Sequence, residues 1–240
     1  MTKAIIQVQA NNPEIKAILS AITKNGKEAR FVGGCIRNHL LRKPIHDLDI
    51  ATQELPQKII SLLNDAGIKA IEITLRSADA LDAIELVANS VPEMTVGAGS
   101  IRQVAQLEEI LNRGAQFAVS PGATGPLISK AKQLHMPFVP GAATASEILT
   151  LMNEGYMLQK FFPAEQLGGT QTLKALSAPL PEVRFFPTGG ITAELAPQYL
   201  ALECVTCIGG SWFIPKALLL ERDFARIKEM SRSAVEITHV

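Results

Sequence analysis

The sequence predicts an α/β fold, a (β/α)8 TIM barrel with an extra N-terminal helical segment. Two observations support this. Eight short, apolar and β-branched segments follow one another along the chain, and amphipathic helical patterns lie between them. From the second segment onward the centres lie about 20–26 residues apart, the length of a strand, a helix and their connections. A doubly wound open sheet is the structural alternative. The eight strand candidates are "LDIAT", "AIEIT", "TVGAGS", "FAVSP", "FVPGA", "LQKFF", "RFFPTGG" and "VTCIGGS".

The helical patterns between these segments have apolar residues at helical spacing. In one of them, Leu107, Ile110 and Leu111 share a face, and Gly114 can end the helix. Strand and helix patterns therefore alternate through most of the chain, as a barrel requires. The clearest helical stretches are "ELPQKIISLLNDAG" (54–67), "SADALDAIELVANS" (77–90), "SIRQVAQLEEILNRG" (100–114) and "TASEILTLMNEG" (144–155).

A further helix is predicted before the first strand candidate, in "NNPEIKAILSAITKNGK". Asn12 can cap it, Pro13 suits its first turn, and Gly26 can end it. We therefore divide the chain into an N-terminal extension over residues 1–44, packed on the barrel, and a barrel domain over residues 45–240. We expect "LDIAT" to be the first barrel strand, with no catalytic role for Asp47 or Asp49.

Composition narrows the functional classes. The 240 residues contain 23 basic and 23 acidic side chains, which argues against a dedicated nucleic-acid binder. No apolar run has membrane-spanning length, and the N-terminus lacks the layout of a signal peptide, so we expect a cytoplasmic protein without a membrane partner. Cys204 and Cys207 form a lone C-x-x-C without further zinc ligands nearby. We interpret them as apolar fillers, with a redox pair as the alternative.

Polar residues at the strand ends indicate an active site, because barrel enzymes place theirs there. In "AIEITLR", the strand period puts Glu72, Thr74 and Arg76 on one face. Glu72 suits a general acid or base, and Arg76 can bind a carboxylate through two parallel hydrogen bonds. A purely structural Glu72–Arg76 pair is the alternative. In "MLQKFFPAE", Lys160 lies mid-strand. Desolvation favours its neutral amine, which can attack a ketone, and a lysine reaching out to solvent is the alternative.

Paired glycines end the last two strand candidates, in "PTGG" and "GGSW". Their backbone N–H groups can approach an anion closely, and Ser211 adds a hydroxyl. Many barrels bind phosphate in the loops after these two strands. Tight turns without a ligand are the alternative.

Residues from about 55 to 240 resemble the class I 2-keto-3-deoxy-6-phosphogluconate (KDPG) aldolases, which often also cleave 4-hydroxy-2-oxoglutarate (KHG). The matching motifs occur in the family's order: "EITLR", "VGAGS", "FAVSPG", "PGAATASE", "KFFPAE", "FFPTGG" and "CIGGSW". The resemblance implies an aldehyde-lyase that binds a small keto acid, forms homotrimers and needs neither a cofactor nor a metal.

The resemblance also implies roles at individual positions. Lys160 matches the Schiff-base lysine, and Glu72 matches the general acid/base. Arg76 matches the residue that binds the substrate carboxylate. Ser100 stands where the family usually has threonine, so substrate fit can differ slightly. The remaining implied substrate-binding residues are Pro121, beside the pyruvate pocket, and Thr188, Gly189, Gly190, Gly210 and Ser211, in the phosphate loops.

Residues 29–71 resemble a different family, the tRNA nucleotidyltransferases, through "FVGGCIRNHLLRKPIHDLDIAT". Asn38 stands where that family has aspartate, and the resemblance stops before a third carboxylate or an RNA-binding helical region. Two carboxylates alone make an incomplete two-metal site. A metal-dependent nucleotidyltransferase fragment and a non-catalytic barrel scaffold therefore remain the alternatives to the aldolase.

Overall fold

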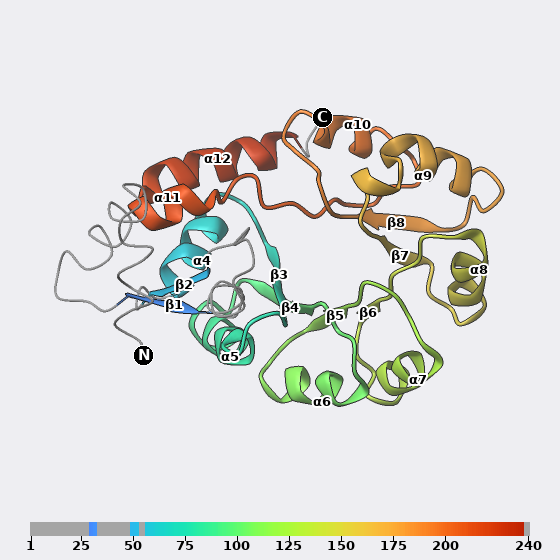
Figure 1. The fold of residues 1–240 in the computed structure, drawn as a ribbon, viewed down its shortest axis with the longest axis horizontal. Helices are drawn as coiled ribbons and strands as arrows, with labels where there is room; N and C mark the ends of the chain where they lie inside the picture. Colours follow the sequence, from blue (N-terminus) through green and yellow to red (C-terminus); the bar gives the residue numbers. More distant parts are fainter. Residues whose placement is uncertain (1–28, 33–48, 53–55, 238–240) are drawn as a thin grey trace, which may run out of the picture.

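A ring of parallel strands with helices on its outside dominates the computed structural model, which describes residues 29–32, 49–52 and 56–237 (Figure 1). The ladders run in chain order, β3-β4-β5-β6 and then β7-β8, and a parallel bridge between Gly141 and Lys160 connects the two sets. Chain order without a reversal is typical of a barrel rather than of a doubly wound sheet. The strands are β3 (Ala70–Thr74), β4 (Thr95–Gly99), β5 (Phe117–Val119), β6 (Phe138–Val139), β7 (Leu158–Phe161) and β8 (Arg184–Pro187).

The last strand candidate lies beside β8, although it forms bridges rather than a continuous ladder. Phe185 pairs with Val205, and Thr188 pairs with Gly209, both in parallel orientation. The N–H of Gly209 donates to the Pro187 carbonyl at 3.0 Å. Residues 205–209 therefore occupy the position after β8, and the glycine pairs after both segments come together.

The prediction that "LDIAT" forms the first barrel strand is wrong. β2 (Asp49–Thr52) pairs antiparallel with β1 (Ala29–Val32) in a separate two-stranded sheet. The segment has the composition of a strand, but composition does not specify which strand it pairs with, and here it pairs with β1 outside the barrel. No ladder joins β3 to residues 205–209 within the described part of the chain.

The helices agree with the predicted amphipathic stretches. In α5, Ile84 and Val87 are buried, and in α6, Leu107 and Ile110 are buried. Gly114, just after α6, has a left-handed φ of 86°, as expected for a glycine that ends a helix. The helices are α4 (Pro56–Asp65), α5 (Ala80–Ser90), α6 (Val104–Asn112), α7 (Gly125–Gln133), α8 (Ala145–Asn153), η1 (Glu165–Leu167, a 3-10 helix), α9 (Gly169–Ser177), α10 (Ala196–Leu200), α11 (Lys216–Glu221) and α12 (Phe224–Ile237).

The predicted helix over residues 11–27 lies outside the described residues, as does Asp47. The division between an extension over residues 1–44 and a barrel over residues 45–240 therefore stays a prediction. None of the described helices is both long and apolar enough to cross a membrane.

Packing between β4 and β5 explains why position 97, in the barrel interior, is a glycine. Gly97 of β4 lies directly opposite Phe117 of β5, and a Cβ added at Gly97 would overlap the Phe117 ring. We expect Gly97→Ala to destabilise the protein by about 1–3 kcal/mol, because overpacking a filled interior forces side chains out of position. Thermal unfolding should show the melting temperature falling by roughly 2–12 °C for a chain of this size.

The matched control for this substitution is Gly125→Ala at the start of α7, where an added Cβ meets nothing within 4 Å. Its melting temperature should equal or exceed that of the wild type, since alanine favours helix over glycine. The double variant Gly97→Ala/Phe117→Leu replaces the aromatic ring with a smaller side chain and should recover part of the lost melting temperature. A wild-type melting temperature for Gly97→Ala would contradict the packing described.

Candidate active site

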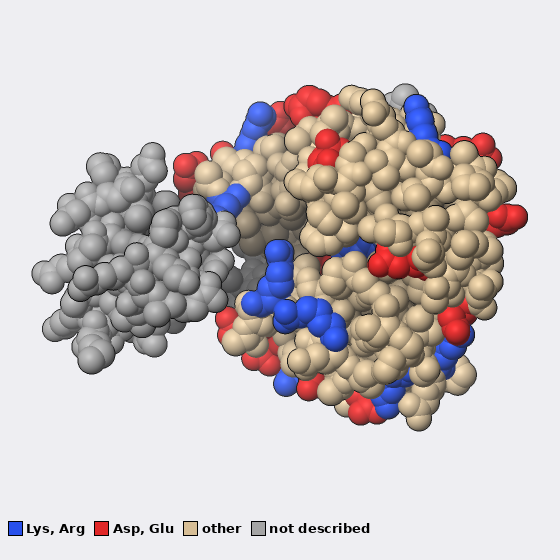
Figure 2. Space-filling model, turned by 45° about the vertical axis from the view of Figure 1, so that its right-hand side comes forward, with Lys and Arg blue, Asp and Glu red and all other residues tan. Residues whose placement is uncertain are grey.

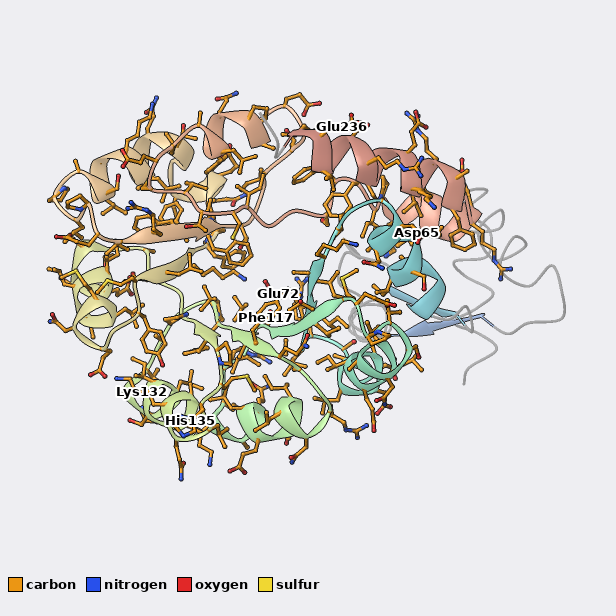
Figure 3. The ribbon with its side chains drawn as sticks, turned by 180° about the vertical axis from the view of Figure 1, so that it is seen from behind. Asp65, Glu72, Phe117, Lys132, His135 and Glu236 are labelled. Atoms are coloured by element: carbon orange, nitrogen blue, oxygen red, sulfur yellow. The ribbon has the colours of Figure 1, made fainter. Side chains whose placement is uncertain are left out.

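A lysine and a glutamate from opposite sides of the ring meet in its interior. Lys160 Nζ of β7 lies 3.2 Å from Glu72 Oε1 of β3, 88 residues away in the chain. The two side chains are only 8% and 17% exposed. Figure 3 shows Glu72 and Phe117 near the middle of the ring, whereas Lys132 and His135 lie on its outer side. An ion pair this far from solvent is unusual, because desolvating two charges is costly, and such pairs are often functional.

Strand alternation in β7 directs Lys160 inward. Its neighbours Gln159 and Phe161 are fully buried; the Gln159 amide donates to the Ile148 carbonyl of α8 at 3.1 Å, and Phe161 belongs to the core between strands and helices. Lys160 thus points to the opposite side of the strand. Its ammonium lies 5.4 Å from the Phe162 ring centroid and 5.9 Å from that of Phe186, within cation–π range. The lysine is therefore buried and held, which excludes the alternative of a side chain reaching out to solvent.

Small residues on the neighbouring strand leave space for Glu72. A Cβ added at Gly99 would overlap the Glu72 carboxylate, so only glycine permits the observed position. Gly97 and Gly99 lie two residues apart in "VGAGS" and therefore share a strand face. Their contribution was missed in the sequence analysis, although this spacing was a usable signal. The alternative of a structural Glu72–Arg76 pair is not observed, since Glu72 pairs with Lys160.

Three of the predicted substrate-binding residues follow adjacent strands. Arg76 follows β3, with its Nε donating to Thr74 Oγ1 at 3.2 Å, and its side chain is exposed. Ser100 follows β4 and has a left-handed φ of 60°, a conformation uncommon outside glycine. Pro121 follows β5, and its carbonyl lies against Gly141, where no side chain would fit. The three residues share one edge of the sheet, and within the described part of the chain Lys160 forms its side-chain hydrogen bond and ion pair with Glu72 instead.

The backbone after β7 and β8 is joined into one unit around Thr188. The Thr188 N–H donates to the Phe161 carbonyl at 3.0 Å, and the Thr188 carbonyl accepts from Ala164 N–H at 2.8 Å. Gly189 and Gly190 follow with left-handed φ values of 100° and 80°. The buried Thr188 Oγ1 has no hydrogen-bond partner among the described residues. This unit places a hydroxyl and two glycines directly beside the strand that carries Lys160.

The second glycine pair ends the segment beside β8. Gly210 and Ser211 are exposed, and a Cβ at Gly210 would overlap the Trp212 ring. Since Gly209 pairs with Thr188, both glycine pairs lie in neighbouring loops, as predicted. Figure 2 shows a hollow in one face of the molecule, with basic side chains in and beside it.

The cysteines of the C-x-x-C motif lie in and just before the segment beside β8. Cys204 is buried, and both Cys204 and Cys207 are free thiols. Desolvation raises the pKa of the Cys207 thiol, although the residue as a whole is exposed. A raised pKa disfavours the reactive thiolate and therefore the redox alternative. Among the described residues, no group of three or more histidine, cysteine or acidic side chains could hold a metal ion.

Comparison with known proteins identifies the family. Residues 42–230 match the family model described as "KDPG and KHG aldolase". The chain belongs to the KDPG and KHG aldolase family. This aldolase is 46% identical over 170 residues to the KHG/KDPG aldolase of Escherichia coli strain K12, covering 71% of this chain and 80% of that protein. It is 38% identical over 210 residues to the 2-dehydro-3-deoxy-phosphogluconate aldolase of Pseudomonas aeruginosa, covering 88% and 94% of the two chains.

Solved structures agree with this assignment. The KDPG aldolase of Legionella pneumophila, captured with pyruvate as a covalent carbinolamine intermediate, superposes with a TM-score of 0.73 at 37% identity. The superposition covers 75% of this aldolase and 87% of that chain. The predicted barrel class is therefore confirmed, and this aldolase is a lyase. The resemblance of residues 29–71 to tRNA nucleotidyltransferases finds no support in these matches, and the family model begins within that stretch, at residue 42.

Proposed function

We propose that this aldolase cleaves KDPG to pyruvate and glyceraldehyde 3-phosphate, and KHG to pyruvate and glyoxylate, through a Schiff base on Lys160. The single observation that carries the proposal is the buried contact of 3.2 Å between Lys160 Nζ and Glu72 Oε1. A lysine must lose a proton before its amine can attack a ketone, and the adjacent carboxylate can accept that proton.

Carbon–carbon cleavage then follows from the iminium ion. Lys160 Nζ attacks the substrate C2, and loss of water from the carbinolamine gives an iminium cation. Glu72, directly or through a water, removes the proton of the C4 hydroxyl. The C3–C4 bond breaks, its electron pair forms an enamine with the iminium carbon, and the aldehyde leaves. Protonation at C3 and hydrolysis release pyruvate and regenerate the lysine. The cationic nitrogen acts as the electron sink, so this sequence requires no metal.

The residues around the pair would bind the rest of the substrate. Arg76 and Ser100, at the ends of β3 and β4, would hold the carboxylate, with Pro121 beside the pyruvate methyl group. Thr188 would offer its hydroxyl, which has no hydrogen-bond partner in the described part of the chain. The phosphate would bind the loops that hold Gly189, Gly190, Gly210 and Ser211, where backbone N–H groups can donate to its oxygens.

Several further properties stay predictions. We expect a homotrimer in the cytoplasm that binds only its keto-acid substrate, without nucleic acid, membrane or cofactor. Size-exclusion chromatography with light scattering measures the oligomeric state.

Pyruvate release from the two keto acids tests the proposed reaction. We expect turnover of both KDPG and KHG, with kcat/KM about 10- to 100-fold higher for KDPG, because hydrogen bonds to a charged group contribute roughly 1.5–3 kcal/mol. A lactate dehydrogenase-coupled assay follows the pyruvate. Release from neither substrate would refute the proposed function and favour the scaffold alternative.

A further inference from the structure

A buried hydrogen bond lies behind the proposed phosphate loop. Tyr199 of α10 is fully buried, and its hydroxyl donates to Glu165 Oε1 of η1. Desolvation first, and then the neighbouring carboxylate, raises the pKa of Tyr199 well above its usual value. The hydroxyl therefore keeps its proton and remains a donor at neutral pH. Neither residue was singled out in the sequence, because they lie 34 positions apart and meet only in the fold.

Glu165 also contacts the glycine turn after β8. Its backbone N–H donates to the Gly189 carbonyl at 3.1 Å. A Cβ added at Gly190 would lie 2.8 Å from Glu165 Cβ and 2.9 Å from its Cγ, so the glutamate stem packs directly against the Gly190 backbone. The Gly189–Gly190 turn, whose N–H groups would bind the phosphate, therefore packs against the Glu165 side chain, and Tyr199 donates a hydrogen bond to that side chain.

A second glycine lies close to both Glu165 and Tyr199. Gly169, the first residue of α9, has a left-handed φ of 60°. A Cβ added there would lie 3.0 Å from Glu165 Oε1 and 3.2 Å from Tyr199 Oη. The carboxylate is therefore confined between Gly169 and Gly190, with the tyrosine hydroxyl as its directional partner.

Because Glu165 is negatively charged, its position affects the binding of a phosphate in the neighbouring loop. A carboxylate free to rotate beside a phosphate site would repel a phosphorylated substrate, and the turn resting on it would lose its support. We propose that Tyr199, acting through Glu165, is a positioning residue for the Gly189–Gly190 turn and thereby sets the preference for phosphorylated over unphosphorylated keto acids. This inference rests on the proposed function, since it assigns a structural origin to the substrate preference of the same site.

The substitution Tyr199→Phe tests the inference, because it removes the hydroxyl and keeps the ring. We expect the KM for KDPG to rise about tenfold, the effect of losing one hydrogen bond at a charged group, with kcat changed less than about twofold. Both constants for KHG should stay within about twofold of wild type, since KHG carries no phosphate. A general loss of structure would affect both substrates.

Matched variants separate positioning from packing. Tyr156 is the other tyrosine of the chain, and its hydroxyl makes no hydrogen bond among the described residues, so Tyr156→Phe should leave both KM values unchanged. Glu165→Gln keeps an acceptor for the tyrosine and should retain most of the preference for KDPG. Glu165→Ala removes the side chain that packs against Gly190 and should also raise the KM for KDPG, through the lost support alone, because no carboxylate remains to repel the phosphate.

The kinetic results distinguish failure of the positioning role from failure of the proposed function. Equal changes for KDPG and KHG in Tyr199→Phe, or no change for either, would overturn the positioning role while leaving the proposed function intact. Wild-type enzyme that cleaves neither substrate would refute the proposed function instead. If Tyr199→Phe does not fold, the comparison of Glu165→Gln with Glu165→Ala decides, and equal KDPG selectivity in those two variants would overturn the inference.

Discussion

Replacing Lys160 with methionine is expected to lower kcat for KDPG cleavage by about 10⁴-fold or more, since it removes the amine proposed to form the iminium ion. Methionine approximates the length of the lysine stem, with sulfur in place of one methylene, and lacks the amine. The variant leaves the mostly buried Glu72 carboxylate without its cation, which lowers stability. Circular dichroism should therefore confirm folding before activity is measured, and the double variant Lys160→Met/Glu72→Gln removes the unpaired charge.

The control for this substitution is Lys132→Met on the outer surface. Lys132 Nζ pairs with Glu154 at 2.6 Å, and both side chains are about half exposed. Because exposed ion pairs contribute little, kcat should stay within about twofold of wild type. Activity that survives Lys160→Met and disappears with EDTA would instead indicate a metal-dependent aldolase.

Replacing Glu72 with glutamine is expected to lower kcat by about 10²- to 10⁴-fold, the usual contribution of a positioned acid/base. The amide retains the shape that Gly99 accommodates, but it cannot exchange a proton with Lys160 or with the substrate. Steady-state pyruvate release gives kcat, and single-turnover kinetics separate the cleavage step from product release.

Glu85→Gln is the matched control for Glu72→Gln. Glu85 lies on α5, where its exposed carboxylate pairs with Arg113, and the substitution should leave kcat unchanged. A kcat for Glu72→Gln within a few-fold of wild type would show that Glu72 is a structural partner of the lysine and that another group moves the protons.

Local patterns predicted most of the barrel. The helices ended close to where the glycines indicated, as at Gly114, and the strand candidates from "AIEIT" to "RFFPTGG" all became strands. These features depend on residues near one another in the chain. The strand period put Glu72 on one face with Thr74 and Arg76, and the family motifs assigned Glu72 and Lys160 to one site, where the structure brings the two side chains within 3.2 Å.

Features that depend on distant pairing were harder to predict. "LDIAT" has the composition of a strand, but composition does not specify the partner, and the segment pairs with Ala29–Val32. The bond between Tyr199 and Glu165 likewise joins two elements whose packing no local pattern reports. The space that Gly99 leaves for the Glu72 side chain could be predicted from "VGAGS" only after Glu72 had been placed on the adjacent strand.

Trapping with borohydride in the presence of pyruvate tests the central claim most directly. Reduction of the iminium ion converts it to a stable secondary amine, so intact mass should increase by one reduced pyruvyl group per chain. Peptide mapping should place that group on Lys160, and Lys160→Met should show no adduct. An adduct on another lysine, or none in an active wild-type enzyme, would contradict the account.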